Sequence, residues 1–421
     1  MPVPVSIVRP LPTRLNGDAV RTRLRPPATL EAGGQRLVVL TNIPTPYRIH
    51  FFNRLAAELG RRGIGFGVLF CAQSEANRHW PFDPSELHFS YAVLPGLHPR
   101  IGGITFHLNP TVGRWLRQWK PTWLLSAGAW LMPTGLLALA ALRSPQCTRL
   151  FWSEGHEDAV LHPTGLVPRL RRQVLRRYDG FAVPNQKSAD YLARQLGGTP
   201  QCLPLPNIVD DSFYVPPTGE QRVATRQKHG IRADDILILQ VAQLEERKGT
   251  MELVQGWTAA AMTCPRLRLV LVGTGTLDRQ VREHARDAIT AGRLILTGPI
   301  SAHAVREWLH AVDAFVLNSK RDPNPLSAIE AGLTGLPLLL SRRIGNFDEL
   351  HQQGQTGIAI EQVTAEAVAR TLRAFAALPT KKRTDFAAAS RHNAAGRFST
   401  SAVVTVFVDA VLRVNRTPAF S

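Results

Sequence analysis

Short apolar runs alternate with longer amphipathic stretches along most of the chain. Residues 37–40 are uniformly apolar, a Pro-rich turn follows them, and residues 48–61 place apolar side chains on one helical face. This order predicts a strand, a loop and a helix. Similar apolar runs recur through the first half of the chain, at 67–71, 91–94, 123–125, 150–152 and 180–183. Because uniformly apolar strands separated by helices are typical of parallel sheets covered on both faces, we predict one such sheet for residues 35–207.

Prolines interrupt the pattern near the middle of the chain. They cluster at 203–207 and 215–217, where a periodic element cannot continue, so we place an interdomain linker at 208–217. A second series of apolar strands follows, at 236–241, 267–272, 294–297, 314–317 and 338–340. A chain of 421 residues also exceeds what one hydrophobic core usually serves. We therefore predict two doubly wound α/β domains, residues 35–207 and 218–395, with a ligand cleft at the carboxyl ends of both sheets.

Two segments bear on targeting. Residues 1–34 combine Pro, Arg and Gly without a continuous apolar stretch of signal-peptide length, which predicts a disordered basic leader. Residues 123–142 contain no charged residue and are about long enough to span a bilayer. Because Pro133 and Gly135 interrupt that run, a buried strand, a turn and a buried helix explain it better than a membrane span.

Composition changes the picture mainly through charge. Lys and Arg number 50 against 32 Asp and Glu, so the surface potential is positive and anionic partners are expected. Nucleic acid, an anionic membrane, a phosphorylated acceptor or a nucleotide donor would each satisfy that potential. Aromatic residues, at 7%, show no stacking array, which disfavours nucleic acid. The four scattered Cys lack metal-ligand spacing, so we assign no metal and expect a reducing, cytoplasmic compartment.

The segment 314–332 carries the most informative chemistry. An apolar strand leads into a loop that contains Asp322. A helix then begins near Leu326 and Ser327 and contains Glu330. The free amide groups at the start of that helix, together with its dipole, favour a phosphate group there. The two carboxylates are far enough apart in sequence to contact two ends of one ligand, although acids in such places also serve as solvated or capping groups.

In this order the segment resembles the C-terminal signature of the family 4 retaining glycosyltransferases, which has two Glu separated by seven residues. Asp322 stands at the first of those positions and Glu330 at the second, and residues 331–337 also follow the family's pattern. The resemblance spans about residues 36–412. It implies the GT-B fold, two Rossmann-like domains that face a central cleft, with Asp322 on the hydroxyls of the transferred sugar and Glu330 on the ribose hydroxyls. It also implies that a last helix, within residues 396–421, returns to the first domain.

The second domain carries the resemblance at further positions. Residues 239–249 resemble the strand and loop where the family places an Arg and a Lys on the diphosphate. Lys248 fits, Gln243 occupies the position of the Arg, and Arg247 is the candidate to replace the missing cation. Glycine turns after the next two strands would flank the nucleotide base, and the resemblance implies contacts from Gly273, Gly298 and Ile300.

The first domain contributes a cation and an acid. Arg48 follows the first strand, as in a subgroup of the family with Pro-Tyr-Arg at this place, and either faces the diphosphate or an acidic acceptor, or only begins the helix. Glu154 ends another strand and matches a recurrent acid of that subgroup. The stretch 168–178 is rich in Arg, and its apolar helical face consists of Leu170, Val174 and Tyr178. Such a helix contacts an anionic membrane or a phosphorylated lipid, or presents a solvated basic face.

The expected function is the transfer of a sugar, with retention of configuration, from a UDP- or GDP-sugar to an acceptor such as a lipid-linked or polysaccharide precursor of the cell envelope. The expected catalytic residues are Asp322, Glu330, Lys248 and Glu154. The expected donor-binding residues are Gln243, Arg247, Gly273, Gly298, Ile300, Leu326, Ser327 and Arg48. Because no Asp-x-Asp occurs, cations and backbone amides, without a metal or other cofactor, are expected to stabilise the leaving diphosphate. Two alternatives stay open: a non-catalytic basic protein that binds nucleic acid or membrane, and a degenerate transferase that binds nucleotide without turnover.

Overall fold

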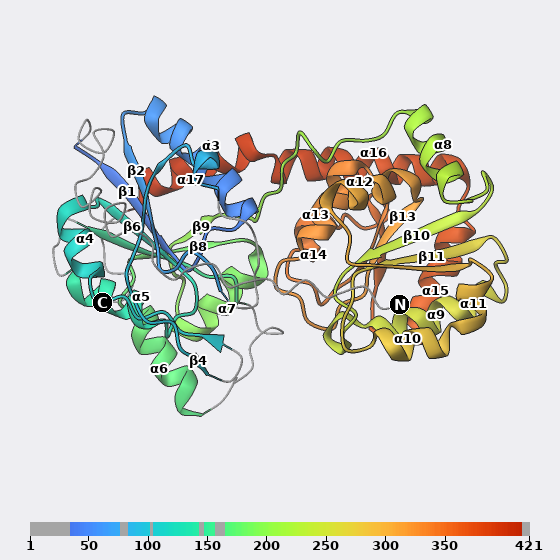
Figure 1. Ribbon diagram of the computed structural model, residues 1–421, viewed down its shortest axis with the longest axis horizontal. Coiled ribbons are helices and arrows are strands. Elements are labelled where there is room, and N and C mark those ends of the chain that lie inside the picture. Colours follow the sequence, from blue (N-terminus) through green and yellow to red (C-terminus); the bar gives the residue numbers. More distant parts are fainter. Residues whose placement is uncertain (1–33, 76–82, 102–103, 143–146, 156–164, 415–421) are drawn as a thin grey trace, which may run out of the picture.

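The structure, a computed structural model, describes residues 34–75, 83–101, 104–142, 147–155 and 165–414. Apart from Gly34, the predicted leader lies outside the described residues. Two α/β domains lie side by side and are bridged by a linker and by the last two helices (Figure 1). The predicted pair of doubly wound domains is confirmed.

The first domain is built on a parallel sheet of seven strands in the order β3-β2-β1-β6-β7-β8-β9. Its strands are β1 (Arg36–Thr41), β2 (Gly65–Phe70), β3 (Ser90–Val93), β6 (Trp123–Ala127), β7 (Thr148–Trp152), β8 (Gly180–Val183) and β9 (Cys202–Pro204). A separate two-stranded hairpin consists of β4 (Arg100–Ile101) and β5 (Ile104–Thr105). The helices are α3 (Pro46–Arg61), α4 (Val112–Trp119), α5 (Pro133–Ala141), α6 (Leu166–Leu175) and α7 (Gln186–Leu196).

Strand β1 shows why a uniformly apolar run forms the centre of this sheet. Successive side chains of a strand point to opposite faces. Leu37 and Val39 pack in a core with α3, whereas Val38 and Leu40 pack in a second core with α4 and α5. All four side chains are 2% exposed or less. The uncharged run 123–142 is accounted for in the same way, since it forms β6 and α5 within this domain.

The second domain repeats this architecture with six parallel strands in the order β12-β11-β10-β13-β14-β15. The strands are β10 (Ile236–Val241), β11 (Leu267–Val272), β12 (Leu294–Gly298), β13 (Ala314–Leu317), β14 (Leu338–Ser341) and β15 (Gly357–Ile360). The α-helices around them are α8 (Gly219–Lys228), α9 (Thr250–Ala261), α10 (Asp278–His284), α11 (Arg286–Thr290), α12 (Ala302–Ala311), α13 (Leu326–Thr334), α14 (Phe347–Leu350) and α15 (Ala365–Ala376). Of these strands, β15 is the one that the sequence pattern does not predict.

The proline-rich stretch at 203–207 contains a strand that the sequence does not indicate. Residues Cys202–Pro204 pair with β8 as β9, the last strand of the sheet. Proline has no N–H group to donate to a ladder, so it is tolerated in a strand at the edge of a sheet. The sheet therefore includes part of the proline-rich stretch that, in the sequence, indicates the end of the domain. The linker predicted over 208–217 lies between β9 and α8.

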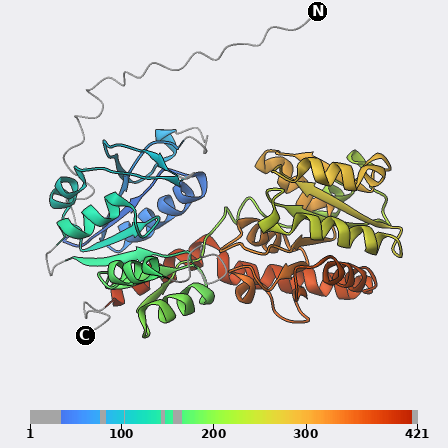
Figure 2. The ribbon, with the colours of Figure 1, turned by 90° about the horizontal axis from the view of Figure 1, so that it is seen from below.

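The chain ends with two consecutive helices, α16 (Thr380–Phe398) and α17 (Thr400–Arg413). Helix α16 lies along the second domain and α17 crosses to the first, where it packs against α3 (Figure 2). Among the described residues, Thr380–Arg413 is the one helical segment long and apolar enough to cross a membrane by length and composition. Because α17 buries Val403, Phe407 and Val411 in the core of the first domain, we interpret it as a core helix.

Candidate active site

Both sheets change direction at a switch point, between β1 and β6 in the first domain and between β10 and β13 in the second. The loops that leave two such strands diverge, which opens a crevice at their carboxyl ends where folds of this kind bind ligands. Most candidate residues of the second domain follow β10 or β13. The topology therefore places them at one crevice.

A largely buried ion pair lies between the loops that follow β10 and β13. The loop after β10 forms a short 3-10 turn, Glu246–Lys248, which ends at Gly249 with a φ of 66°. A Cβ at Gly249 would also lie 2.5 Å from the carbonyl oxygen of Asn318, so only glycine fits. The turn directs Lys248 toward the loop after β13, where its Nζ pairs with the carboxylate of Asp322. The two side chains are only 12% and 9% exposed.

The loop that carries Asp322 is held tightly in place. Its carbonyl oxygens at Asp322, Pro323 and Pro325 accept hydrogen bonds from Gly345 N (2.8 Å), Asn185 Nδ2 (3.2 Å) and Asn346 Nδ2 (3.3 Å), respectively. Asn185 belongs to the first domain, at the start of α7. The candidate site therefore lies where the two domains touch.

Helix α13 begins directly after this loop, and Leu326 and Ser327, both half-buried, form its first turn. No side chain among the described residues caps it, so its first amide groups are available to a ligand. Glu330 lies one turn further on, and burial raises the pKa of its carboxyl to about 7. A hydrogen bond with Tyr214 acts in the opposite direction on that pKa. Tyr214, from the linker, is 7% exposed, and burial together with the charge of Glu330 raises the pKa of its hydroxyl.

The remaining candidates of the second domain line the exits of β10, β11 and β12. Arg247 donates hydrogen bonds to the side chains of Gln243 and Glu245, so the residue proposed to replace the missing cation does lie beside Gln243. Gly273 and Gly298 pair with each other through a backbone hydrogen bond of 3.0 Å. Both have positive φ, 130° and 68°, which glycine adopts readily. Ile300 follows this turn and packs partly against the core of the domain.

Arg48 and Glu154 lie in the first domain. The guanidinium of Arg48 bonds to the hydroxyl of Thr41 and lies 5.1 Å from the ring centroid of Trp152, the residue that ends β7. Its Nε and the Oε1 of Glu154 are buried without a hydrogen-bond partner among the described residues. In that part of the chain, neither side chain forms a hydrogen bond or ion pair with the second domain. The structure thus groups Lys248, Asp322 and α13, and leaves Arg48 and Glu154 on the opposite domain.

Two family models match the two domains. The model "Glycosyl transferase 4-like domain" matches residues 50–207, and the model "Glycosyl transferases group 1" matches residues 221–393. Together the two matches cover most of the chain. The chain belongs to the glycosyltransferases.

Curated relatives of this glycosyltransferase include the lipopolysaccharide core biosynthesis glycosyltransferase LpsE of Rhizobium meliloti, 26% identical over 191 residues, or 45% of this chain and 54% of the relative. The glycogen synthase of Mycobacterium tuberculosis is 25% identical over 266 residues, 61% of this chain and 60% of the relative. The 2-deoxystreptamine glucosyltransferase of Streptomyces kanamyceticus is 25% identical over 312 residues, 68% of this chain and 78% of the relative. The chain spans about half the length of several curated relatives it matches.

Solved structures show the fold of this glycosyltransferase to be GT-B. Anabaena Alr3699/HepE in complex with UDP superposes with a TM-score of 0.69 at 16% identity, covering 90% of this chain and 100% of the other. WaaG, a glycosyltransferase of lipopolysaccharide biosynthesis, gives a TM-score of 0.60 at 17% identity, covering 89% and 99%. The same fold at such low identity identifies the architecture, and the chemistry has to be argued from the residues.

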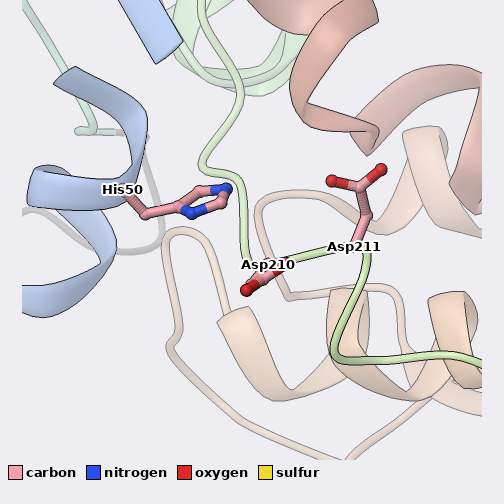
Figure 3. Close-up of side chains that lie close together, drawn as sticks. All are labelled: His50, Asp210 and Asp211. Carbon is pink, nitrogen blue, oxygen red and sulfur yellow. The ribbon is translucent and has the colours of Figure 1, made fainter. Parts of the chain in front are cut away.

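Another polar cluster in this glycosyltransferase lies at the interdomain linker, away from the Lys248–Asp322 pair. His50 on α3 points toward Asp210 and Asp211 of the linker (Figure 3), and their ligand atoms lie within 4.8 Å of one another. Thr400, at the start of α17, bonds both His50 Nε2 (3.1 Å) and Asp211 Oδ1 (2.7 Å), and Asp210 Oδ1 accepts from Ser212. These bonds join the first domain, the linker and α17, so we interpret the cluster as part of the interdomain hinge.

The structure corrects the predicted end of one helix and adds two site residues. The sequence pattern predicts Leu170, Val174 and Tyr178 on one face of a helix over 168–178, but α6 ends at Leu175, so Tyr178 lies beyond it. Val174 and Tyr178 are buried, whereas Leu170 is 46% exposed. Tyr214 is not predicted, since a tyrosine beside linker prolines gives no sequence signal until the fold brings it to Glu330. Asn324 is a further residue that the sequence pattern does not single out, although its place between two prolines marks a backbone without the usual donors.

Proposed function

We propose that this chain transfers a sugar from a nucleoside-diphosphate donor to an acceptor hydroxyl. The observation that supports this most is the buried Lys248–Asp322 pair next to the uncapped start of α13. A cation and free amide groups at one point suit a diphosphate, whose negative charge grows as the bond to the sugar breaks. Asp322 would contact the sugar hydroxyls, and Glu330 the ribose hydroxyls.

The donor we propose is a UDP- or GDP-hexose. The structural neighbour HepE has been solved in complex with UDP and in complex with UDP-glucose, which supports a uridine nucleotide as the first choice. Gly273, Gly298 and Ile300 would face the base. Lys248, Arg247 and the start of α13 supply the positive charge that a bound metal would otherwise provide, so we propose transfer with no resident metal or other cofactor.

A screen of nucleoside diphosphates tests this function directly. Ligand that binds only the folded protein raises apparent stability, by about 2.7 kcal/mol at a hundredfold excess over the dissociation constant. We expect UDP or GDP to raise the melting temperature by several degrees, the monophosphate to act more weakly, and the matching nucleotide-sugar to be hydrolysed slowly in water. No stabilisation by any nucleoside diphosphate would refute the proposal. Binding of UDP or GDP without sugar release over a broad acceptor panel would favour a degenerate transferase. The motivating observations are Asp322 and Gln243, at positions where the family has Glu and Arg.

Retention of anomeric configuration is part of the proposal. In this scheme the leaving phosphate takes the acceptor's proton, and the acceptor attacks from the side that the phosphate leaves. Glu154 and Arg48 would then act on the acceptor or the sugar from the first domain. Nuclear magnetic resonance of the first-formed product distinguishes retention from inversion.

We further propose that the acceptor is a lipid-linked or polysaccharide precursor of the cell envelope, reached at the inner face of the membrane from the cytoplasm. Exposed apolar side chains gather on three elements of the first domain: Leu97, Ile101 and Ile104 at the β4–β5 hairpin, Leu131 before α5, and Leu166 and Leu170 on α6. The hairpin and α6 lie at the same end of that domain (Figure 1). The Thr134–His107 backbone bond and the stacking of Arg171 on Trp130 connect the three elements.

The charge of this surface supports an anionic membrane as its partner. No Asp or Glu occurs between Leu87 and Ser153 or between Gly165 and Arg177, whereas Arg100, Arg169 and Arg177 are present. Apolar side chains beside cations suit the interface of an anionic bilayer. The Glu75 carboxylate, which contacts His107 next to the hairpin at 3.0 Å, is only 13% exposed. The surface extends the predicted basic helix to the hairpin.

Vesicle binding provides the measurement. We expect the protein to float with vesicles that contain phosphatidylglycerol and not with pure phosphatidylcholine. The double variant Ile101→Asp/Leu166→Asp should bind at least tenfold more weakly, because each change removes about 1.5–3 kcal/mol of apolar burial and adds repulsion. Met262→Asp is the control, since Met262 is also an apolar side chain and is 83% exposed on the other domain. Equal binding of the double variant and the control would exclude this surface.

A further inference from the structure

The loop between Asp322 and α13 is short of backbone donors. Its sequence is Asp-Pro-Asn-Pro, and proline has no N–H group. Pro325 is the residue that precedes α13, and its side chain cannot cap the amide groups at the start of that helix. A phosphate at this helix start would therefore meet no amide from residues 323 and 325, which are placed immediately beside it.

The residue between these prolines has an unusual environment. Asn324 is 8% exposed, and both its Oδ1 and its Nδ2 are buried with no hydrogen-bond partner among the described residues. A carboxamide can make up to four hydrogen bonds. Burial of such a group without partners is costly, and most buried polar side chains in folded proteins avoid it. A buried carboxamide in this situation therefore calls for a partner outside the chain.

The surrounding contacts fix the backbone on either side of Asn324. The carbonyl oxygens on either side of Asn324, at Pro323 and Pro325, are bonded to Asn185 and Asn346. A Cβ at Gly345 would lie 1.6 Å from the Pro323 oxygen, so this side of the loop is already in close contact with Gly345. The backbone is thus held from both neighbours, and Asn324 stays beside Asp322 and the start of α13.

We propose that the Asn324 side chain is a donor ligand that replaces the amide groups missing from this loop. Its Nδ2 donates to an oxygen of the diphosphate, and its Oδ1 accepts from a hydroxyl of the sugar or from a water bound between them. This inference rests on the proposed nucleotide-sugar site and assigns to it a residue that determines affinity for the phosphates. It explains why a polar residue is buried where an apolar one would cost less.

Calorimetry with UDP, GDP and their nucleosides tests the assignment. Asn324→Ala is expected to weaken binding of whichever diphosphate the unmodified protein binds by about tenfold or more, and to leave binding of uridine or guanosine unchanged. Asn324→Asp should weaken the diphosphate further, because a carboxylate neither donates nor tolerates the phosphate charge. Asn324→Ser, which keeps a donor, should recover part of the loss.

Thermal unfolding without ligand separates this role from a structural one. If the Asn324 side chain gains its partner only from a bound ligand, ligand-free Asn324→Ala should melt at the same temperature as the unmodified protein or at a higher one, because the change removes an unpartnered polar group. A lower melting temperature with equal loss of nucleoside and diphosphate binding would show a structural role and overturn the proposal. Unchanged diphosphate binding in Asn324→Ala would overturn it while leaving the proposed function intact. Failure of the unmodified protein to bind UDP and GDP would remove both.

Discussion

Replacing Lys248 with Met is expected to weaken binding of the donor's nucleoside diphosphate by about a hundredfold, or roughly 3 kcal/mol. Lys248 is the cation that the loop after β10 directs into the crevice, and a buried charge that meets a diphosphate contributes far more than an exposed one. The same change should lower the free energy of unfolding by about 3–5 kcal/mol, because it removes the cation that pairs with the Asp322 carboxylate, which is only 9% exposed. Calorimetry and chemical denaturation measure the two effects.

A double variant separates these two effects. In Lys248→Met/Asp322→Asn the negative charge of Asp322 is removed together with the positive charge of Lys248, so most of the lost stability should return while diphosphate binding stays weak. Lys320→Met is the matched control: Lys320 belongs to the loop after β13, but pairs with Glu252 at 2.6 Å and is 30% exposed. We expect the control to change stability by about 1 kcal/mol or less and to leave binding unchanged. If the double variant regained diphosphate binding, Lys248 would have only a structural role.

Most strands of both domains could be predicted because a short, uniformly apolar run in the sequence is enough to indicate a buried strand. β8, β10, β11 and β13 begin and end where the sequence indicates. In the two large sheets, the missed strands lie where the pattern is weak: β9 contains a proline at a sheet edge, and β15 is a four-residue edge strand that begins with glycine. An edge strand pairs on one side only, so its sequence carries fewer constraints.

The site could be predicted in part for a related reason. The resemblance to the family implies that Asp322, Lys248 and the start of α13 contact one donor, and all three follow strands at a switch point of the sheet. Tyr214 reaches Glu330 from the linker, a contact that depends on the tertiary path of a stretch without periodicity. Whether Arg48 and Glu154 act on the donor depends on how the two domains approach each other, which neither pattern nor motif determines.

Nucleotide binding is expected to strengthen about tenfold between pH 6 and pH 8 through the ionisation of Glu330. Burial raises the pKa of this carboxyl from its ordinary value to about 7. Ribose hydroxyls donate to the ionised form, whose fraction rises about tenfold over this interval if only that form binds. Binding at pH 6.5 should then release a proton, which calorimetry in buffers of different ionisation enthalpy detects. The sign for stability is the reverse: the folded protein holds this proton more tightly than the unfolded chain, so the contribution of Glu330 to stability falls as the pH rises from about 4.5 to about 7.

Two variants assign this titration to Glu330. Glu330→Gln should bind as weakly at pH 8 as the unmodified protein binds at low pH, and retain only the pH dependence of the nucleotide's own phosphates. Tyr214→Phe removes a hydrogen bond that lowers the pKa of Glu330, so the midpoint of the binding curve should move to higher pH. The two variants therefore change the pH dependence of nucleotide binding in different ways. Glu330→Gln removes the transition, and Tyr214→Phe moves its midpoint. A pH profile of Glu330→Gln that coincides with that of the unmodified protein would place the ribose elsewhere in the cleft.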